Sequence, residues 1–314
     1  MHILIGSDAE LAAKPLRMLT VHAHPDDEAS KGASTLAQYG ASGVGTVLVT
    51  ATGGEEGEIV NKAMDRPDVR ERLVDVRREE LIRASEVIGF DQVWMLGYRD
   101  SGMPDSEANA HAQCFAQAPL LEAAGRLVSI IRSVRPHVII TYPDVQRGYR
   151  HPDHLRVHEV TDLAFQLAGD PDWSPTPGSG VTPVEPWQPL RLFYNVWSKA
   201  RLVALHGQYT ALGLESPYDD KWLSRPGQDQ RITTRIDIRS HYGVRRDALL
   251  AHRTQVDPNE RFWFGLPEDA ECRAYPYEDY ILAQDRTEGE VPTDDLFAGI
   301  LTDHVGSAPD ELVS

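Results

Sequence analysis

The segment that specifies the architecture is MLTVHAHPDDE, residues 18–28. Its first six residues are mostly apolar or β-branched, which predicts a strand over 18–23. The polar residues from His24 to Glu28 then form the loop at the carboxyl end of that strand. An Ala-rich run at about 32–39 predicts a helix after the loop. The segment therefore predicts a strand, a polar loop and a helix in that order.

The same alternation continues along the chain. Strands are predicted over 44–50, 92–96 and 137–142, with helices over about 68–88 and 119–134 between them. Asp68 is expected to cap the first of these helices. Strands that alternate with helices imply a mostly parallel sheet with helices on both faces, which is a doubly wound, Rossmann-like α/β fold. Residues 1–168 are the predicted catalytic core.

The second half of the sequence has a different composition. Residues 169–189 are rich in Pro, Gly and Ser, which predicts a long surface excursion rather than a hinge between domains. Strands over 191–197 and 231–238 and a helix over 240–255 follow it. We expect residues 190–286 to complete the same domain and to form a wall of the binding pocket. The acidic residues 287–314 are predicted to be a loosely attached tail.

Charge and composition exclude several classes of partner. The formal net charge is −17, whereas nucleic acid and anionic membranes both call for a basic face. The first residues show no secretory pattern, and no apolar run reaches the about 18 residues that span a membrane, so we expect a cytoplasmic protein. Cys114 and Cys272 stand far apart and outside any CxxC pattern. Any metal must therefore be held by histidine and carboxylate.

Two His-Pro-Asp clusters follow predicted strands. His24-Pro25-Asp26-Asp27 comes after the first strand, and His151-Pro152-Asp153-His154 comes shortly after the strand that ends near residue 142. Because ligands bind outside the carboxyl ends of parallel strands, folding should bring the two clusters to one rim. Two histidines and one carboxylate are a common set for a catalytic zinc with a position left for water. We expect His24, Asp27 and His154 to be that set.

The remaining polar residues of these clusters suggest catalytic roles. Asp26 is expected to be the general base, because a metal lowers the pKa of bound water and a nearby carboxylate can then take its proton. His151 can stabilise an oxyanion or protonate a leaving amine, and Asp153 can fix the tautomer of His151 and raise its pKa. Tyr149 offers a phenolic donor to the same oxyanion.

Each of these features also has a simpler interpretation. A single His-Pro-Asp tripeptide is usually a solvated turn with Asp as a helix cap, and Tyr149 could be a packing residue. Residues 53–58 (GGEEGE) are too acidic for a phosphate loop and are expected to be a solvated turn. Arg77 would by default belong to a salt-bridged helix face, and Asp100 to a loop ion pair. His241 and His252 are expected at the surface or at an interface.

AHPDDE at residues 23–28 and HPDH at residues 151–154 together resemble the two signatures of the LmbE-like, or PIG-L, N-acetylglucosaminyl deacetylase superfamily. The resemblance implies a Rossmann-like fold and a zinc ion, or ferrous iron, as cofactor. By position it implies metal ligands at His24, Asp27 and His154, a base at Asp26, and transition-state stabilisers at Tyr149 and His151.

Further segments resemble the branch of that superfamily that cleaves mycothiol S-conjugates. They are HAHPDDEASKG at 22–32, NKAMD at 61–65, DSG at 100–102, AHRTQVDP at 251–258 and LFAGI at 296–300. The resemblance implies a small-molecule thiol conjugate as partner, cleaved at the amide between S-substituted N-acetylcysteine and glucosaminyl-inositol. Lys31 matches this branch, whereas the related deacetylase of mycothiol biosynthesis has a small polar residue there. Arg77, Asp100 and Glu58 fall where the family contacts the glucosaminyl-inositol part, and such charged groups suit a polyol.

One departure and several alternatives stay open. Arg147 and Arg150 replace the usual small residues around Tyr149, and they either bind an acidic group on the S-linked part or are solvated. The same machinery could deacetylate N-acetylglucosaminyl-inositol. A metal-dependent sugar-binding protein without catalysis is a third function, although it would not require the base Asp26. Antibiotic clusters, lincomycin's among them, encode amidases that resemble this branch, so a biosynthetic role is an alternative to detoxification. The sequence is also compatible with a homo-oligomer.

Overall fold

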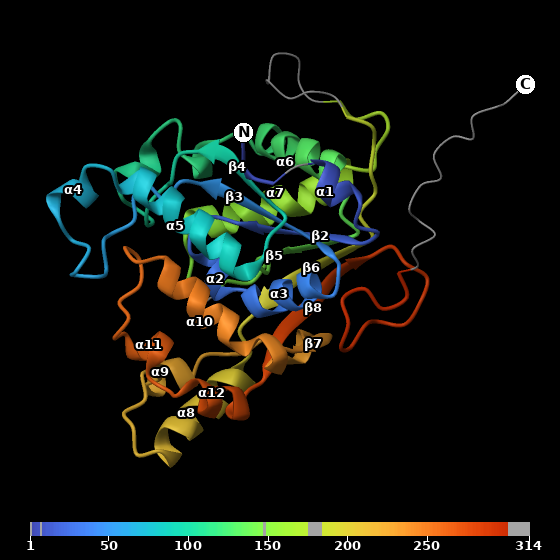
Figure 1. Cartoon of the computed structure of the whole chain (residues 1–314). Helices are drawn as coiled ribbons and strands as arrows, with labels where there is room; N and C mark the ends of the chain where they lie inside the picture. Colours follow the sequence, from blue (N-terminus) through green and yellow to red (C-terminus); the bar gives the residue numbers. More distant parts are fainter. Residues whose placement is uncertain (1, 7, 147–148, 175–183, 301–314) are drawn as a thin grey trace, which may run out of the picture.

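The computed structural model describes residues 2–6, 8–146, 149–174 and 184–300. Its strands form one mixed sheet in the order β1-β4-β3-β2-β5-β6-β8-β7 (Figure 1). They are β1 (His2–Ile5), β2 (Arg17–His22), β3 (Gly45–Thr52), β4 (Gln92–Tyr98), β5 (Val138–Thr141), β6 (Arg191–Val196), β7 (Thr234–Asp237) and β8 (Tyr277–Asp285). Five neighbouring strands run parallel, in the order β4, β3, β2, β5 and β6. The pairs β1 with β4, β6 with β8 and β7 with β8 are antiparallel. The predicted mostly parallel α/β architecture is confirmed.

Helices cover both faces of this sheet (Figure 1). The helices of the described chain, including those that lie away from the sheet, are α1 (Asp8–Ala12), α2 (Asp27–Ser30), α3 (Ala33–Ala41), α4 (Pro67–Arg70), α5 (Leu73–Ile88), α6 (Leu120–Val134), α7 (Pro152–Leu167), α8 (Lys199–Ala211), α9 (Asp220–Leu223), α10 (Tyr242–Ala251), α11 (Arg261–Phe264) and α12 (Glu268–Ala274). In the described part of the chain, none of them is long and apolar enough to cross a membrane.

Alternation along the buried strands sends side chains to two cores. In β2, Leu19 and Val21 belong to the core under α6 and α7, whereas Met18 belongs to the core under α3, α5 and α10. Successive side chains of a strand point to opposite faces, so a strand buried on both sides has an apolar run rather than an alternating pattern. Because both faces are sealed by helices, the polar loops at the strand ends become the accessible edge of the sheet.

Two helix predictions need correction. The single helix expected over 68–88 is two helices, α4 and α5, because Arg72 leaves the helical region at φ −122°. Asp68 does not cap it, since Pro67 takes the first helical position and places Asp68 inside the first turn. The segment after β2, expected to be an irregular loop, also contains the short helix α2.

The C-terminal half extends the same sheet. Strands β6, β8 and β7 continue it beyond β5, and β8 was not anticipated. The described part of the expected loose tail is anchored, because Leu296 is fully buried and the backbone N–H of Leu296 donates to the hydroxyl of Tyr39 at 2.7 Å. Apolar residues in this acidic segment explain the error, since they pack against α3. Residues 301–314 of the tail lie outside the described residues.

Candidate metal centre

Loops from four parallel strands meet at one edge of the sheet. His24 follows β2, Glu56 follows β3, Asp100 follows β4, and His151 lies between β5 and α7. Together with residues of the C-terminal half they line a cavity of about 410 Å³. Carboxyl ends of parallel strands are the usual binding edge of open α/β sheets. The two His-Pro-Asp clusters therefore do come together in space.

Three buried side chains of this cavity could hold a metal ion: His24, Asp27 and His154. Oδ2 of Asp27 lies 3.4 Å from Nδ1 of His24 and 3.2 Å from Nε2 of His154. Bonds of about 2.0–2.2 Å from a tetrahedral metal would separate neighbouring donors by about 3.3–3.6 Å. The donor types and spacing therefore fit a divalent cation such as zinc.

The charge around His24 also favours a cation at this place. Burial disfavours a charged imidazole, but hydrogen bonds to Asp100, Asp153 and Asp27 outweigh it and raise the pKa of His24 well above its ordinary value. Buried carboxylates need positive charge nearby, because an unpaired ionised group in a protein interior is costly. A divalent cation bound to His24 in place of a proton would supply the positive charge.

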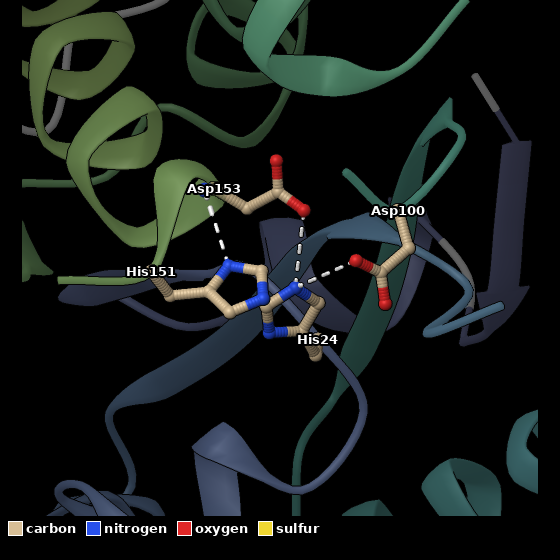
Figure 2. Close-up of side chains that lie close together, drawn as sticks. All are labelled: His24, Asp100, His151 and Asp153. Atoms are coloured by element: carbon tan, nitrogen blue, oxygen red, sulfur yellow. Dashed lines mark hydrogen bonds and ion pairs between the residues drawn. The ribbon is translucent and has the colours of Figure 1, made fainter. Parts of the chain in front are cut away.

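A second set of contacts fixes the orientation of His24 (Figure 2). Nε2 of His24 lies 3.1 Å from Oδ2 of Asp153 and 3.5 Å from Oδ1 of Asp100. Ser101 holds Asp153 in turn, because its backbone N–H donates to Oδ2 at 2.9 Å and its hydroxyl donates to Oδ1. With Nε2 donating to Asp153, Nδ1 is the ring nitrogen that faces Asp27, and it is the one that would bind a cation once its proton is lost. His24 is therefore oriented as a metal ligand would be.

His151 differs from the expectation. It caps α7, and its Nδ1 accepts the backbone N–H of Asp153 at 3.2 Å (Figure 2). Burial, reinforced by the neighbouring His24, lowers the pKa of His151 to about 4. The Asp153 carboxylate does raise this pKa, as expected, but burial and His24 outweigh it, so the net shift is downward. A neutral imidazole that accepts at Nδ1 carries its hydrogen at Nε2, so His151 is a neutral donor.

Asp26 is held in an unusual backbone conformation. Its φ of 110° and ψ of −24° lie where a residue other than glycine is strained, at a cost on the order of 1–3 kcal/mol. Its N–H donates to Oε2 of Glu28 at 2.9 Å, and its Oδ2 accepts from Nη2 of Arg77 at 3.2 Å. Burial raises the pKa of Asp26 to about 6 although Arg77 opposes the shift. The strained loop thus presents a carboxylate to the cavity.

The four residues expected to contact substrate all line the cavity: Lys31, Glu58, Arg77 and Asp100. Two of them also support the metal loop. Nζ of Lys31 lies 2.6 Å from Oδ1 of Asp27. Arg77 is 2% exposed and donates to the carbonyl oxygens of Gly54 at 2.5 Å and Pro25 at 2.7 Å. The default assignment of Arg77 to a salt-bridged surface of its helix is therefore wrong, because Arg77 is buried and its ion pair is with Asp26 of the metal loop.

Residues around the second cluster lie at the cavity mouth. Tyr149 lines the cavity, is 55% exposed, and has its ring 5.2 Å from that of His154. Its hydroxyl lies 3.9 Å from Sδ of Met103. Arg150 is exposed, and Arg147 lies outside the described residues. Tyr149 can therefore reach a bound ligand from the rim.

Several residues of the site are absent from the two motifs. Ser101 and the stacked ring of Tyr142, 4.5 Å from that of His154, come from other strand ends. His252, expected at the surface, is fully buried against Glu28 because the end of α10 packs on α2. The expected solvated turn at 53–58 instead contributes three residues to the cavity wall. The only sequence signal for His252 was its position within the AHRTQVDP segment.

Apolar residues also line the cavity. They are Val60, Met103, Leu249, Val256 and Trp263. Three of them come from the C-terminal half, which agrees with the expectation that this half walls the pocket. The cavity thus offers both charged groups and apolar surface to one ligand.

Comparisons with known proteins identify the family of this chain. The family described as GlcNAc-PI de-N-acetylase (PIG-L) matches residues 19–165. A mycothiol S-conjugate amidase of Streptomyces coelicolor is 43% identical, covering 91% of this chain and 97% of its own. A 1D-myo-inositol 2-acetamido-2-deoxy-alpha-D-glucopyranoside deacetylase of Thermobifida fusca is 42% identical, covering 76% and 83%.

Two solved structures share the fold. The N,N'-diacetylchitobiose deacetylase of Pyrococcus horikoshii superposes with a TM-score of 0.56 at 16% identity, covering 85% of this chain and 83% of its own. A conserved protein of Thermus thermophilus gives 0.52 at 22% identity, covering 87% and 97%. Because the amidase and the deacetylase named above are 43% and 42% identical to it over most of its length, the chain is a hydrolase of amide bonds that belongs to the GlcNAc-PI de-N-acetylase (PIG-L) family.

Proposed function

We propose that this protein is a zinc-dependent amidase that cleaves mycothiol S-conjugates. The bond hydrolysed is the amide between an S-substituted N-acetylcysteine and glucosaminyl-inositol. The relative that is 43% identical carries this activity in its name. The observation that carries the proposal for this chain is the cavity lining, which combines charged and apolar residues.

The charged and the apolar residues of the lining suit the polyol part and the S-linked part of such a substrate, respectively. Glu58, Arg77 and Asp100 provide charged partners for the hydroxyl groups of a sugar and an inositol. Met103 and Trp263 provide apolar surface for the S-linked substituent. An acetyl group would need little of that apolar surface. The apolar residues of the lining therefore favour the amidase over the deacetylase.

The chain supplies the proton transfers. We assign the metal to His24, Asp27 and His154; when bound, the ion polarises the amide carbonyl and makes water more acidic. Asp26 then takes the proton of the attacking water and returns it to the leaving amine. His151 and Tyr149 donate hydrogen bonds to the oxyanion that forms from the carbonyl. Asp153 keeps His24 in the orientation described above.

The deacetylase remains the second candidate, because one relative with that name is 42% identical. Its substrate would present only an acetyl group beside the same glucosaminyl-inositol. Lys31, which the sequence resemblance associates with the amidase branch, is held against Asp27 next to the proposed metal. The two substrates differ in the group that would contact the apolar residues of the cavity.

A substrate comparison tests the proposal. Purified protein is analysed for metal and assayed on an aromatic mycothiol S-conjugate and on N-acetylglucosaminyl-inositol, with wild type, Asp26→Ala and Trp263→Ala. We expect zinc, a higher kcat/KM for the conjugate, loss of both activities in Asp26→Ala, and a raised KM for the conjugate alone in Trp263→Ala. Faster turnover of the acetyl substrate would favour the deacetylase, and turnover of neither would refute both assignments.

A further inference from the structure

A buried ion pair joins the C-terminal half to the loop that carries Asp26. His252 follows the last residue of α10 and is fully buried, and Glu28 in α2 is 1% exposed. Nε2 of His252 lies 2.5 Å from Oε1 of Glu28. Burial disfavours both charges, yet each partner favours the charge of the other, so the pKa of His252 is raised and that of Glu28 is lowered. The two buried side chains are thus joined by a short hydrogen bond.

The other carboxylate oxygen of Glu28 is bonded to the backbone of Asp26. Oε2 of Glu28 accepts the backbone N–H of Asp26 at 2.9 Å. That residue is one of three non-glycine residues with positive φ in the described chain. A strained backbone persists only where the surroundings determine it. His252, Glu28 and the backbone of Asp26 therefore form a continuous chain of contacts.

We propose that His252 is a positioning residue, which acts through Glu28 to hold Asp26 in the conformation that directs its carboxylate into the cavity. The proposal rests on the assignment of Asp26 as the base. His252 itself does not line the cavity, so it touches neither substrate nor the donor atoms of the metal site. Its effect is on where Asp26 points.

The surrounding contacts separate this role from simple anchoring of α10. Two residues further on, Thr254 donates its N–H and its hydroxyl to Glu80 of α5 at 2.9 Å and 2.6 Å. This second link already holds the turn after α10 to the body of the protein. Asp26 keeps a separate contact with Arg77 on its carboxylate. Loss of His252 should therefore release the backbone of Asp26 while the turn remains in place.

The test compares His252→Ala, Glu28→Gln and their double variant with His137→Ala. His137 is a matched control, since it is also buried but lies at the start of β5 outside the cavity lining. We expect His252→Ala to lower kcat about 10- to 100-fold, with KM and bound metal nearly unchanged. The double variant should be no slower than the slower single variant, because both act through one chain of contacts. His137→Ala should keep the wild-type kcat per folded molecule.

A crystal structure of each variant gives a readout that needs no substrate. Asp26 should keep its positive φ in wild type and His137→Ala and lose it in His252→Ala. The proposal is overturned if Asp26 keeps that conformation in His252→Ala, if that variant loses metal, or if its kcat is unchanged. If wild type cleaves no amide but Asp26 relaxes in His252→Ala, the proposed function fails and the positioning contact stands.

Discussion

The two His-Pro-Asp segments have the same three residues and put them to different use. In the first, the backbone turns through the strained Asp26 into the four-residue helix α2, and both carboxylates that follow the proline face the site. In the second, Pro152 takes the first position of the sixteen-residue helix α7 and His151 becomes its cap. The carboxylate of Asp153 then lies behind His24 rather than in the cavity.

The difference shows that backbone geometry assigns the role of a motif residue. A proline followed by regular helix turns the next carboxylate away from the cavity, whereas a proline followed by a left-handed residue turns it inward. The histidines that precede the two prolines, His24 and His151, also differ in role. His24 lies among the donors of the proposed metal site, whereas His151 accepts the backbone N–H of Asp153 as the cap of α7. His154, one residue beyond the tripeptide, supplies the metal donor of the second segment.

The strongest way to break this comparison is to remove the donor of the second segment. His154→Ala should weaken metal binding by at least about 100-fold, since even contacts behind the ligands are worth 10–100-fold. Bound metal is measured by competition with a chromogenic chelator. His158→Ala, one turn further along α7 and outside the cavity lining, is the control and should keep its metal. Equal metal loss in the two variants would show that helix damage, not a ligand, is responsible.

His151→Ala should keep its metal and lose rate. Removal of a hydrogen-bond donor to the oxyanion is expected to lower kcat about 100-fold or more. Steady-state kinetics on the metal-loaded variant measure this. If His151→Ala loses as much metal as His154→Ala, the division of roles within the second segment is incorrect.

Asp153→Asn tests the contact that orients His24. The variant keeps the size of the side chain but removes the charge that orients His24. We expect a loss of about 10- to 100-fold, shared between metal affinity and kcat. Both quantities are measured on the same preparation. An unchanged metal affinity and an unchanged kcat would mean that Ser101 and the backbone suffice to orient His24.

The smallest effect is expected for Ser101→Ala. It leaves one buried oxygen of Asp153 without its hydroxyl donor, which should cost about 1–3 kcal/mol of unfolding free energy. The activity of the folded enzyme should change less than that of Asp153→Asn, because the backbone N–H of residue 101 still donates. Urea unfolding measures the loss. Ser34→Ala is the control, since the buried Ser34 hydroxyl has no hydrogen-bond partner in the described structure and should be dispensable.

Much of the fold was predictable from local pattern. The strands β2 to β6 are apolar runs of a kind that only a sheet covered on both faces can bury, and their alternation with helices implies parallel order. Strand β8 escaped prediction because it contains Glu278, Asp279 and Gln284, so its signal was weak. The break at Arg72 escaped prediction because no Gly or Pro marks it in the sequence.

The sequence by itself determined the chemistry available at the site, because two clusters of histidine and aspartate at strand ends leave few other uses for such residues. Tertiary structure alone decided which carboxylate faces which histidine. Asp153 serves His24, 129 positions away, and Glu28 pairs with His252, 224 positions away. Side-chain direction follows from the backbone after each proline and from the packing of distant helices, and neither is written in the spacing of the motifs.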